Sequence, residues 1–273
     1  MGGWADWIGR SETRSDVITP GLVQRYCATL DRTVSDEIPQ GLHWCLCLPD
    51  AASAELGPDG HPAKGGFLPP IRLPRRMWAS SSVSFEQPLR MGDAITRIST
   101  IASIEEKSGR SGDLVFVAVD HETRAGERVA VREQQNIVYR EPASAPAPSA
   151  DGSPADQSEW DWQQEIVPSE PLLFRYSALT FNSHRIHYDR PYAVAEEGYA
   201  GLVVQGPLMA TLLLDLAASE LGANRLSRFA FRGQSPAIVN QAIHLVGRQQ
   251  GENISLAVLG DDGREIMTAQ GAI

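Results

Sequence analysis

The stretch Leu208-Met209-Ala210-Thr211-Leu212-Leu213-Leu214-Asp215-Leu216-Ala217-Ala218 is apolar on nearly every side of a helix. A helix of this kind must be covered on most of its faces. Gln205-Gly206-Pro207 stands directly before it, and proline is well tolerated in the first turn of a helix, where its missing N–H has no partner anyway. These residues predict a buried helix that begins near Gly206 and runs to about Leu221.

Four segments of strand character follow this helix. They are Arg228–Arg232, Gln241–Val246, Ile254–Leu259 and Glu265–Ala269. An Asp262-Gly263 turn precedes the last segment, and Asp-Gly between alternating apolar residues is a strong hairpin signal. A fully apolar helix followed by antiparallel strands predicts a sheet that wraps around the helix.

The first half of the chain shows the same order of features. An apolar segment, Gly41–Leu48, precedes strand-like segments at Val83–Phe85, Asp93–Ile98, Asp113–Val119 and Arg128–Val131. We therefore predict an α+β protein with two curved antiparallel sheets, each wrapped around a central helix. The two sheets should pair edge to edge, because such pairing hides strand edges that would otherwise aggregate. Two unrelated α+β domains are the alternative.

A polar segment separates the two halves. Residues 141–159 contain no large apolar side chain, and such a segment cannot bury enough surface to offset its ordering entropy. It is typical of an extended linker. The predicted organisation is an N-terminal domain at 1–140, a linker at 141–160 and a C-terminal domain at 161–273.

Composition limits the classes of partner. The net charge of −10 disfavours nucleic acid and anionic lipid as main partners, because both would be repelled over most of the surface. No run of about 18 apolar residues could span a membrane, and the first residues lack the features of a secretory signal. Three cysteines, at 27, 45 and 47, are typical of a reducing interior. We expect a cytoplasmic protein that binds neither membrane nor nucleic acid.

The chemistry-bearing residues gather in Tyr176–Asp189. This segment holds His184 and His187, two of the six histidines, together with Asn182 and Asp189. An imidazole close to the start of a buried helix places a proton shuttle beside a ready-made anion site. This pairing suits reactions in which a thioester carbonyl gathers negative charge.

The order of helix and strands, doubled, together with this segment resembles the double-hotdog MaoC-like enoyl-CoA hydratases and 3-hydroxyacyl-thioester dehydratases. Their motif Asp-x-Asn-Pro-x-His falls on Asn182–His187, and their His-Gly pair at the start of the central helix falls on Gln205-Gly206. Gly65–Pro70 and Leu73–Trp78 also resemble the subgroup whose front half is a degenerate hotdog. That subgroup includes mitochondrial-type thioester dehydratases and hydratases of mesaconyl-C4-CoA or itaconyl-CoA.

The resemblance implies a hydro-lyase that reversibly hydrates an α,β-unsaturated acyl-CoA, with a short-chain dicarboxyl-CoA such as itaconyl-CoA or mesaconyl-C4-CoA as substrate. The alternatives are a 3-hydroxyacyl-thioester dehydratase of fatty-acid synthesis, a thioesterase, and a non-catalytic thioester-binding module. No cofactor is expected beyond the coenzyme A that the substrate carries. A homodimer is a further expectation.

The resemblance also assigns the catalytic residues. His187 would take and return a proton at neutral pH, and the backbone N–H of Gly206 would stabilise the enolate oxygen. Asn182 stands where the family has a catalytic Asp, and an amide can orient water but cannot relay a proton. Asn182 would hold the water or the imidazole, or cap the following turn. Asp189 is the alternative carboxylate.

The remaining candidates are predicted to bind substrate, the arginines because guanidinium groups bind phosphate and carboxylate. They are His184, Arg185, Gln205, Arg232 and Arg76. No metal site is expected, because His184, His187 and Asp189 lack the setting of a helical zinc motif. A structural role is predicted for His43, and His61, His121 and His244 receive no function.

Overall fold

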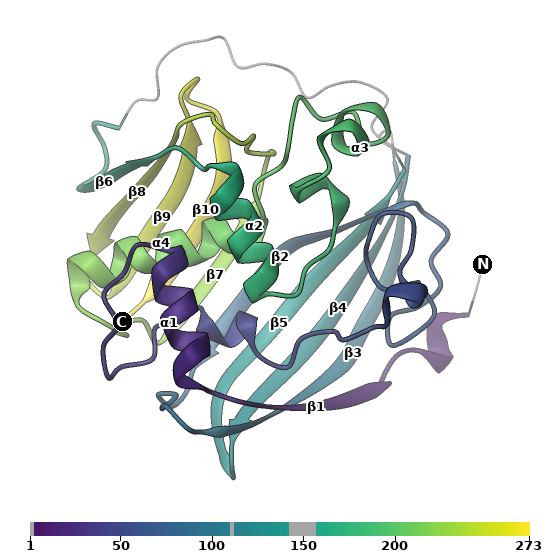
Figure 1. Cartoon of the computed structure of the whole chain (residues 1–273), viewed down its shortest axis with the longest axis horizontal. Helices are drawn as coiled ribbons and strands as arrows, with labels where there is room; N and C mark the ends of the chain where they lie inside the picture. Colours follow the sequence, from purple (N-terminus) through teal and green to yellow (C-terminus); the bar gives the residue numbers. More distant parts are fainter. Residues whose placement is uncertain (1–2, 110–111, 142–156) are drawn as a thin grey trace.

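The computed structural model describes residues 3–109, 112–141 and 157–273. Ten strands of this part of the chain form one antiparallel sheet in the order β1-β3-β4-β5-β2-β7-β10-β9-β8-β6 (Figure 1). The strands are β1 Ser11–Val17, β2 Arg75–Phe85, β3 Ala94–Gly109, β4 Gly112–Ala125, β5 Arg128–Arg140, β6 Trp162–Ile166, β7 Arg228–Gly233, β8 Ile243–Gln250, β9 Asn253–Gly260 and β10 Glu265–Ala272.

Four α-helices and four short 3-10 helices accompany the sheet within the described residues. They are α1 Pro20–Thr29, α2 Glu170–Leu179, α3 Arg190–Ala195 and α4 Gly206–Leu221, with η1 Trp4–Asp6, η2 Leu42–Cys45, η3 Ser53–Glu55 and η4 Arg185–His187. Helices α1 and α2 begin alike. The side chains of Thr19 and Ser169 accept hydrogen bonds from the first turn, and a proline follows within two residues. Each half of the chain therefore contributes one capped helix after its first strand.

Helix α4 confirms the predicted helix with the predicted bounds. It lies against β8, β9 and β10 on one face of the sheet (Figure 1). Nine of its residues are buried, among them Leu208 and Leu213, which are fully enclosed. It ends at Gly222, whose positive φ of 93° suits glycine. Burial of an apolar helix on all sides explains why its sequence has no polar face.

The corresponding segment of the first half differs. Gly41–Leu48 was expected as an apolar helix, but it forms only the short η2. Gly41 lies at φ 96° and Cys47 at φ 52°, and both values interrupt a right-handed helix. A Cβ at Gly41 would lie 2.8 Å from the hydroxyl of Tyr26, so the tight approach requires glycine. The expected central helix of this half is thus reduced to one turn, as fits a degenerate copy.

The two halves join edge to edge through β2 and β7, as predicted. Their register runs from Ser80 opposite Arg232 to Ser84 opposite Arg228. The side chains of Arg32 and Asp215 form an ion pair between the segment after α1 and helix α4. The fold is a double hotdog in which the two curved sheets are continuous. The domain boundaries stay a prediction, because residues 142–156 of the expected linker lie outside the described residues.

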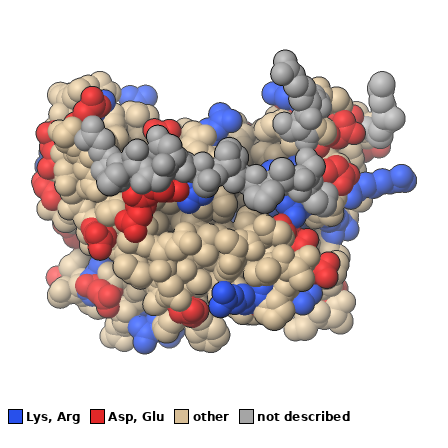
Figure 2. All heavy atoms as spheres, turned by 90° about the horizontal axis from the view of Figure 1, so that it is seen from above, with Lys and Arg blue, Asp and Glu red and all other residues tan. Residues whose placement is uncertain are grey.

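Figure 2 shows the distribution of charge on one side of the molecule. There, acidic and basic side chains are interspersed between broad uncharged areas. Among the described residues, no helix is long and apolar enough to cross a membrane.

Candidate active site between the two halves

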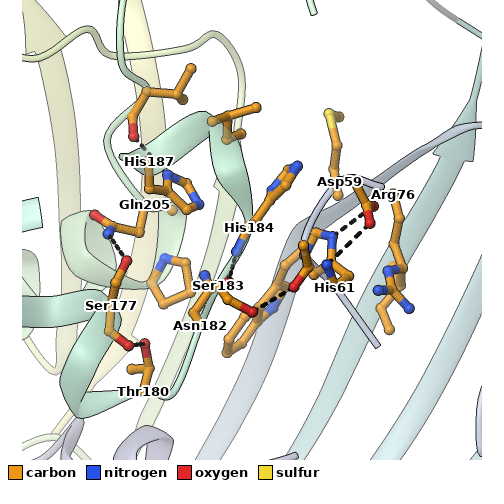
Figure 3. A pocket seen from close by; sticks show the side chains of 18 of the residues that line it. Asp59, His61, Arg76, Ser177, Thr180, Asn182, Ser183, His184, His187 and Gln205 are labelled. Atoms are coloured by element: carbon orange, nitrogen blue, oxygen red, sulfur yellow. Dashed lines mark hydrogen bonds and ion pairs between the residues drawn. The ribbon is translucent and has the colours of Figure 1, made fainter. Parts of the chain in front are cut away.

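A cavity of about 2100 Å³ is lined by residues of both halves. The second half contributes the segment after α2, helix η4 and the beginning of α4. The first half contributes a loop before β2 and β2 itself (Figure 3). The side chains most relevant to chemistry are those of Asp59, His61, Arg76, Asn182, His184 and His187. Such a concave site with few convergent polar groups is the usual form of a small-molecule site.

His187 lies at the end of η4 with its side chain 7% exposed. Its Nδ1 donates to the carbonyl oxygen of Val203 at 2.7 Å, which leaves Nε2 without a hydrogen. Burial is the main cause that lowers the pKa of His187 to about 4, and the charge of His61 lowers it further, against the Val203 hydrogen bond. His187 is therefore a neutral imidazole at neutral pH, ready to accept a proton at Nε2.

Gly206 is the first residue of α4 and lines the cavity. Its N–H is one of the first N–H groups of the helix, which have no intrahelical acceptor. The helix dipole adds positive potential at this end. A Cβ at this position would meet only the Trp78 carbonyl oxygen, at 3.9 Å. Protein packing therefore does not require glycine at 206, and the residue borders the cavity in which a ligand would lie.

Gln205 holds the start of α4 in place. Its side-chain amide donates to the carbonyl oxygen of Leu173 and to the hydroxyl of Ser177, both at 2.9 Å. Oε1 is buried without a partner among the described residues. The side chain thus ties α4 to α2, which leaves only Oε1 for the predicted contact with substrate.

Asn182 follows α2 and lines the cavity. Its Oδ1 accepts a hydrogen bond from the backbone N–H of His184 at 3.0 Å, so the side chain closes the turn that leads into η4. This is the capping role that was expected as one of its alternatives. The amide Nδ2 remains for a water or substrate atom.

The loop before β2 docks onto this same segment. Ser183 donates its hydroxyl to the carbonyl oxygen of Gly60 at 2.5 Å, and the N–H of Arg185 donates to that of Asp59 at 2.9 Å. Gly60 has φ 86°, and a Cβ there would lie 2.0 Å from the Ser183 carbonyl oxygen. Only glycine fits this contact, so Gly60 allows the loop before β2 to pack against the motif segment, residues 182–187.

Docking of the loop brings three imidazoles into one row. The rings of His61 and His184 are 4.0 Å apart, and those of His184 and His187 are 5.4 Å apart and nearly perpendicular. Burial, followed by the charges of His61 and His187, lowers the pKa of His184 to about 2. Burial also lowers the pKa of His61. All three rings are therefore neutral at neutral pH.

Asp59 is the carboxylate of this row. Its Oδ2 lies 2.9 Å from Nδ1 of His61 (Figure 3), and its Oδ1 accepts from the backbone N–H of the same residue. Although burial opposes ionisation, these hydrogen bonds and the charges of His61 and Arg76 hold the pKa of Asp59 well below its usual range. One potential ligand atom each of Asp59, His61 and His184 lies within 4.8 Å of the others, so these residues also have the composition of a metal site.

The arginines that were predicted to bind substrate differ in whether they line the cavity. Arg76 on β2 lines the cavity and donates to the Pro62 carbonyl oxygen at 3.2 Å. Arg185 turns away from it, because its guanidinium binds Asp189 at 2.8 Å and lies over the ring of Tyr192.

Arg232 is exposed on β7 and does not line the cavity, and neither does Asp189, which caps α3. The structure thus places Arg185, Arg232 and Asp189 outside the wall of the cavity, and their roles in substrate binding and proton transfer stay predictions.

The first-half wall of the cavity is a buried polar network. Trp78 donates to Ser81, and Ser81 and Trp44 both donate to the carboxyl group of Glu133. Burial raises the pKa of Glu133, against these hydrogen bonds. His43 lies behind this wall with Nε2 3.7 Å from Glu133, and burial lowers its pKa to about 3. A structural role for His43 stays the better interpretation.

His61 and Asp59 were missed by the sequence analysis. Asp59-Gly60-His61-Pro62 places a carboxylate two residues before an imidazole, and that spacing was the available signal. It was not used because the partner segment at 182–187 lies more than a hundred residues away in sequence.

The fold and the cavity together define a double-hotdog protein of the class that hydrates and dehydrates acyl thioesters. Residues 41–239 match the model of the family described as hydroxyacyl-thioester dehydratase type 2. The chain is also 43% identical to the mesaconyl-C(4)-CoA hydratase of Chloroflexus aurantiacus, over 97% of this chain and 96% of that protein. The chain belongs to the hydroxyacyl-thioester dehydratase type 2 family.

Solved structures agree on the fold. A MaoC-like dehydratase from Phytophthora capsici superimposes with a TM-score of 0.72 at 14% identity, covering 97% of this chain and 95% of the other. A conserved hypothetical protein from Mycobacterium tuberculosis, described as a double hotdog fold, gives a TM-score of 0.56 at 14% identity with the same coverage. At these identities the likeness concerns the fold alone.

Proposed function

We propose that the protein reversibly adds water to an α,β-unsaturated acyl-CoA and forms a 3-hydroxyacyl-CoA. The observation that carries the proposal is the neutral imidazole of His187, with Nε2 free, in the same cavity as the amino end of α4. Family membership and the 43% identical mesaconyl-C(4)-CoA hydratase support the same reaction.

In the proposed reaction, Nε2 of His187 takes a proton from water as the water oxygen attacks Cβ. The electrons of the Cα=Cβ bond move toward the thioester, and its oxygen becomes enolate-like. The N–H of Gly206 and the dipole of α4 stabilise that oxygen. The imidazolium of His187 then gives its proton to Cα, which restores the thioester carbonyl. Every step uses groups of this chain, and no cofactor enters.

We further propose a short-chain dicarboxyl-CoA as the substrate, in line with the named substrate of the Chloroflexus aurantiacus relative. Arg76 is one of several arginines that line the cavity, and its charge acts on His61, so its guanidinium suits a free carboxylate on the acyl group.

The test is incubation of the pure protein with crotonyl-CoA, mesaconyl-C4-CoA and itaconyl-CoA, with enoyl absorbance and free thiol followed in parallel. We expect enoyl absorbance to fall without release of thiol, and faster with a dicarboxyl substrate than with crotonyl-CoA. Release of thiol would indicate a thioesterase instead. Binding without either signal would indicate a non-catalytic thioester-binding module.

A further inference from the structure

The proposed reaction needs a carboxylate to orient the attacking water or to stabilise a protonated imidazole, and the motif segment of the second half supplies none. His187 is supported by the carbonyl group of Val203 and not by a carboxylate, so its imidazolium form is poorly stabilised. Oδ1 of Asn182 is occupied by the His184 N–H, and Asp189 does not line the cavity. No carboxylate of the motif segment therefore orients a water molecule or stabilises a protonated imidazole.

The first half supplies such a group. The ionised carboxylate of Asp59 accepts from Nδ1 of His61 at 2.9 Å, which fixes one tautomer of that ring. Nε2 of His61 then has no hydrogen and can accept a hydrogen bond. No described residue donates to this nitrogen. A carboxylate on the far nitrogen of an imidazole both orients the ring and stabilises its protonated form.

The position of His61 matches this chemistry. Its ring packs at a tilt of 37° against that of His184, whose other neighbour is His187, and all three residues line the cavity. The docked loop holds the ring there through Ser183 and Gly60. The charged and titratable groups that act on His61 are Asp59, Arg76, Lys64, His184 and His187.

We propose that His61, oriented by Asp59, is a second catalytic residue that binds the attacking water and the hydroxyl group it becomes. This role rests on the proposed hydration. One O–H of the water gives its proton to Nε2 of His187, while the other O–H donates a hydrogen bond to Nε2 of His61. The new C–O bond forms at Cβ, the π electrons move to the enolate, and His187 returns the proton to Cα. The 3-hydroxyl group stays bound to His61.

Two substitutions test this role on the enoyl-CoA that the wild type hydrates fastest. His61→Gln should lower kcat about tenfold with little change in KM, because it removes one hydrogen bond that orients the attacking water. Asp59→Asn should lower kcat by a similar factor. Its amide N–H would donate to Nδ1 and move the ring hydrogen to Nε2, which would displace the acid limb of the pH–rate profile.

Two further variants separate this role from loop docking and from a general loss of stability. His244→Gln removes a second carboxylate–imidazole pair, with Asp261 at 2.8 Å, that lies outside the cavity, and it should keep the wild-type kcat. Ser183→Ala removes the bond to Gly60 but keeps Asp59 and His61. It should raise KM and lower the melting temperature, and should lower kcat far less than His61→Gln does.

Three results would overturn the role of His61 in an active wild type. They are a wild-type kcat in His61→Gln, an equal loss of kcat in Ser183→Ala, and activity that requires a bound metal and is abolished by EDTA. The last result would instead make Asp59, His61 and His184 a metal site. A wild type that hydrates none of the three enoyl-CoA esters would refute the proposed function itself, and the role of His61 with it.

Discussion

The two halves of the molecule share a fold but have kept different parts of it. The second half retains a long buried helix, α4, whose amino end faces the cavity. In the first half the corresponding segment is the single turn η2, and its histidine, His43, is enclosed behind Trp44 and Glu133. The first half instead contributes β2 and the docked loop to the shared cavity. A copy that has lost its helix can therefore still supply walls and polar groups to its partner.

The comparison of His43 with His187 shows what distinguishes the two sites. Both rings are buried, and burial lowers the pKa of His43 to about 3 and that of His187 to about 4. Burial and pKa thus fail to separate them. His187 lines the cavity, whereas His43 contacts the rings of Trp44 and Phe85. Access to substrate is the difference that should decide function.

The strongest test of this difference is the pair His187→Ala and His43→Ala. We expect His187→Ala to lower kcat at least 100-fold with the fold intact, because it removes the proton shuttle. His43→Ala should lower the free energy of unfolding but change kcat much less. Steady-state kinetics and urea denaturation of both variants measure this. The comparison fails if the two variants lose activity equally, or if His187→Ala stays near the wild-type rate.

A smaller effect is expected at Asn182, where the family has a carboxylate. Asn182→Asp keeps an acceptor for the His184 N–H and should preserve or raise kcat. The new negative charge should raise the pKa of His187 and shift the acid limb of the pH–rate profile upward. Asn182→Ala should lose activity by up to about tenfold, as for one hydrogen bond, which is less than His187→Ala loses. An Asp variant as inactive as His187→Ala would show that the amide N–H donates to substrate.

A further effect is expected in the pH dependence of the free energy of unfolding. Burial lowers the pKa of His43, His121, His184 and His187 from 6.5 to about 3, 4, 2 and 4. The unfolded chain therefore binds more protons below pH 6.5, and stability should fall as the pH drops from 6.5 toward 4. Each ring can contribute up to about 1.4 kcal/mol per pH unit.

Urea denaturation at pH 7.5 and pH 5 measures this loss, and His187→Ala should reduce its slope. Equal stability of the wild type at the two pH values would contradict the burial of neutral imidazoles in both halves.

The hydrophobic pattern within one segment was sufficient to predict helix α4. Helix α4 has the predicted bounds because an apolar run between Gly206 and Gly222 leaves little choice. Gly41–Leu48 is equally apolar, but two positive φ values and the contact with Tyr26 stop it after one turn. Hydrophobicity alone cannot distinguish a full helix from such a remnant.

The site was predicted less completely, for two physical reasons. His61 takes its place only when its loop docks on Ser183, a contact distant in sequence. Arg232 was predicted to bind substrate, but the alternation of residues along β7 places it outside the cavity wall. Phe229 and Phe231 are buried on β7, so residue 232 must face the opposite side of the strand.

The join between β2 and β7 bears on how the protein is made. During synthesis, β2 and β5 are complete long before β7 leaves the ribosome, so one backbone edge of β2 has no partner in the nascent chain. Unpaired strand edges are templates for pairing with other molecules. Translation of the second half is therefore the interval in which this protein is most exposed to aggregation, and a pause between the halves would lengthen it.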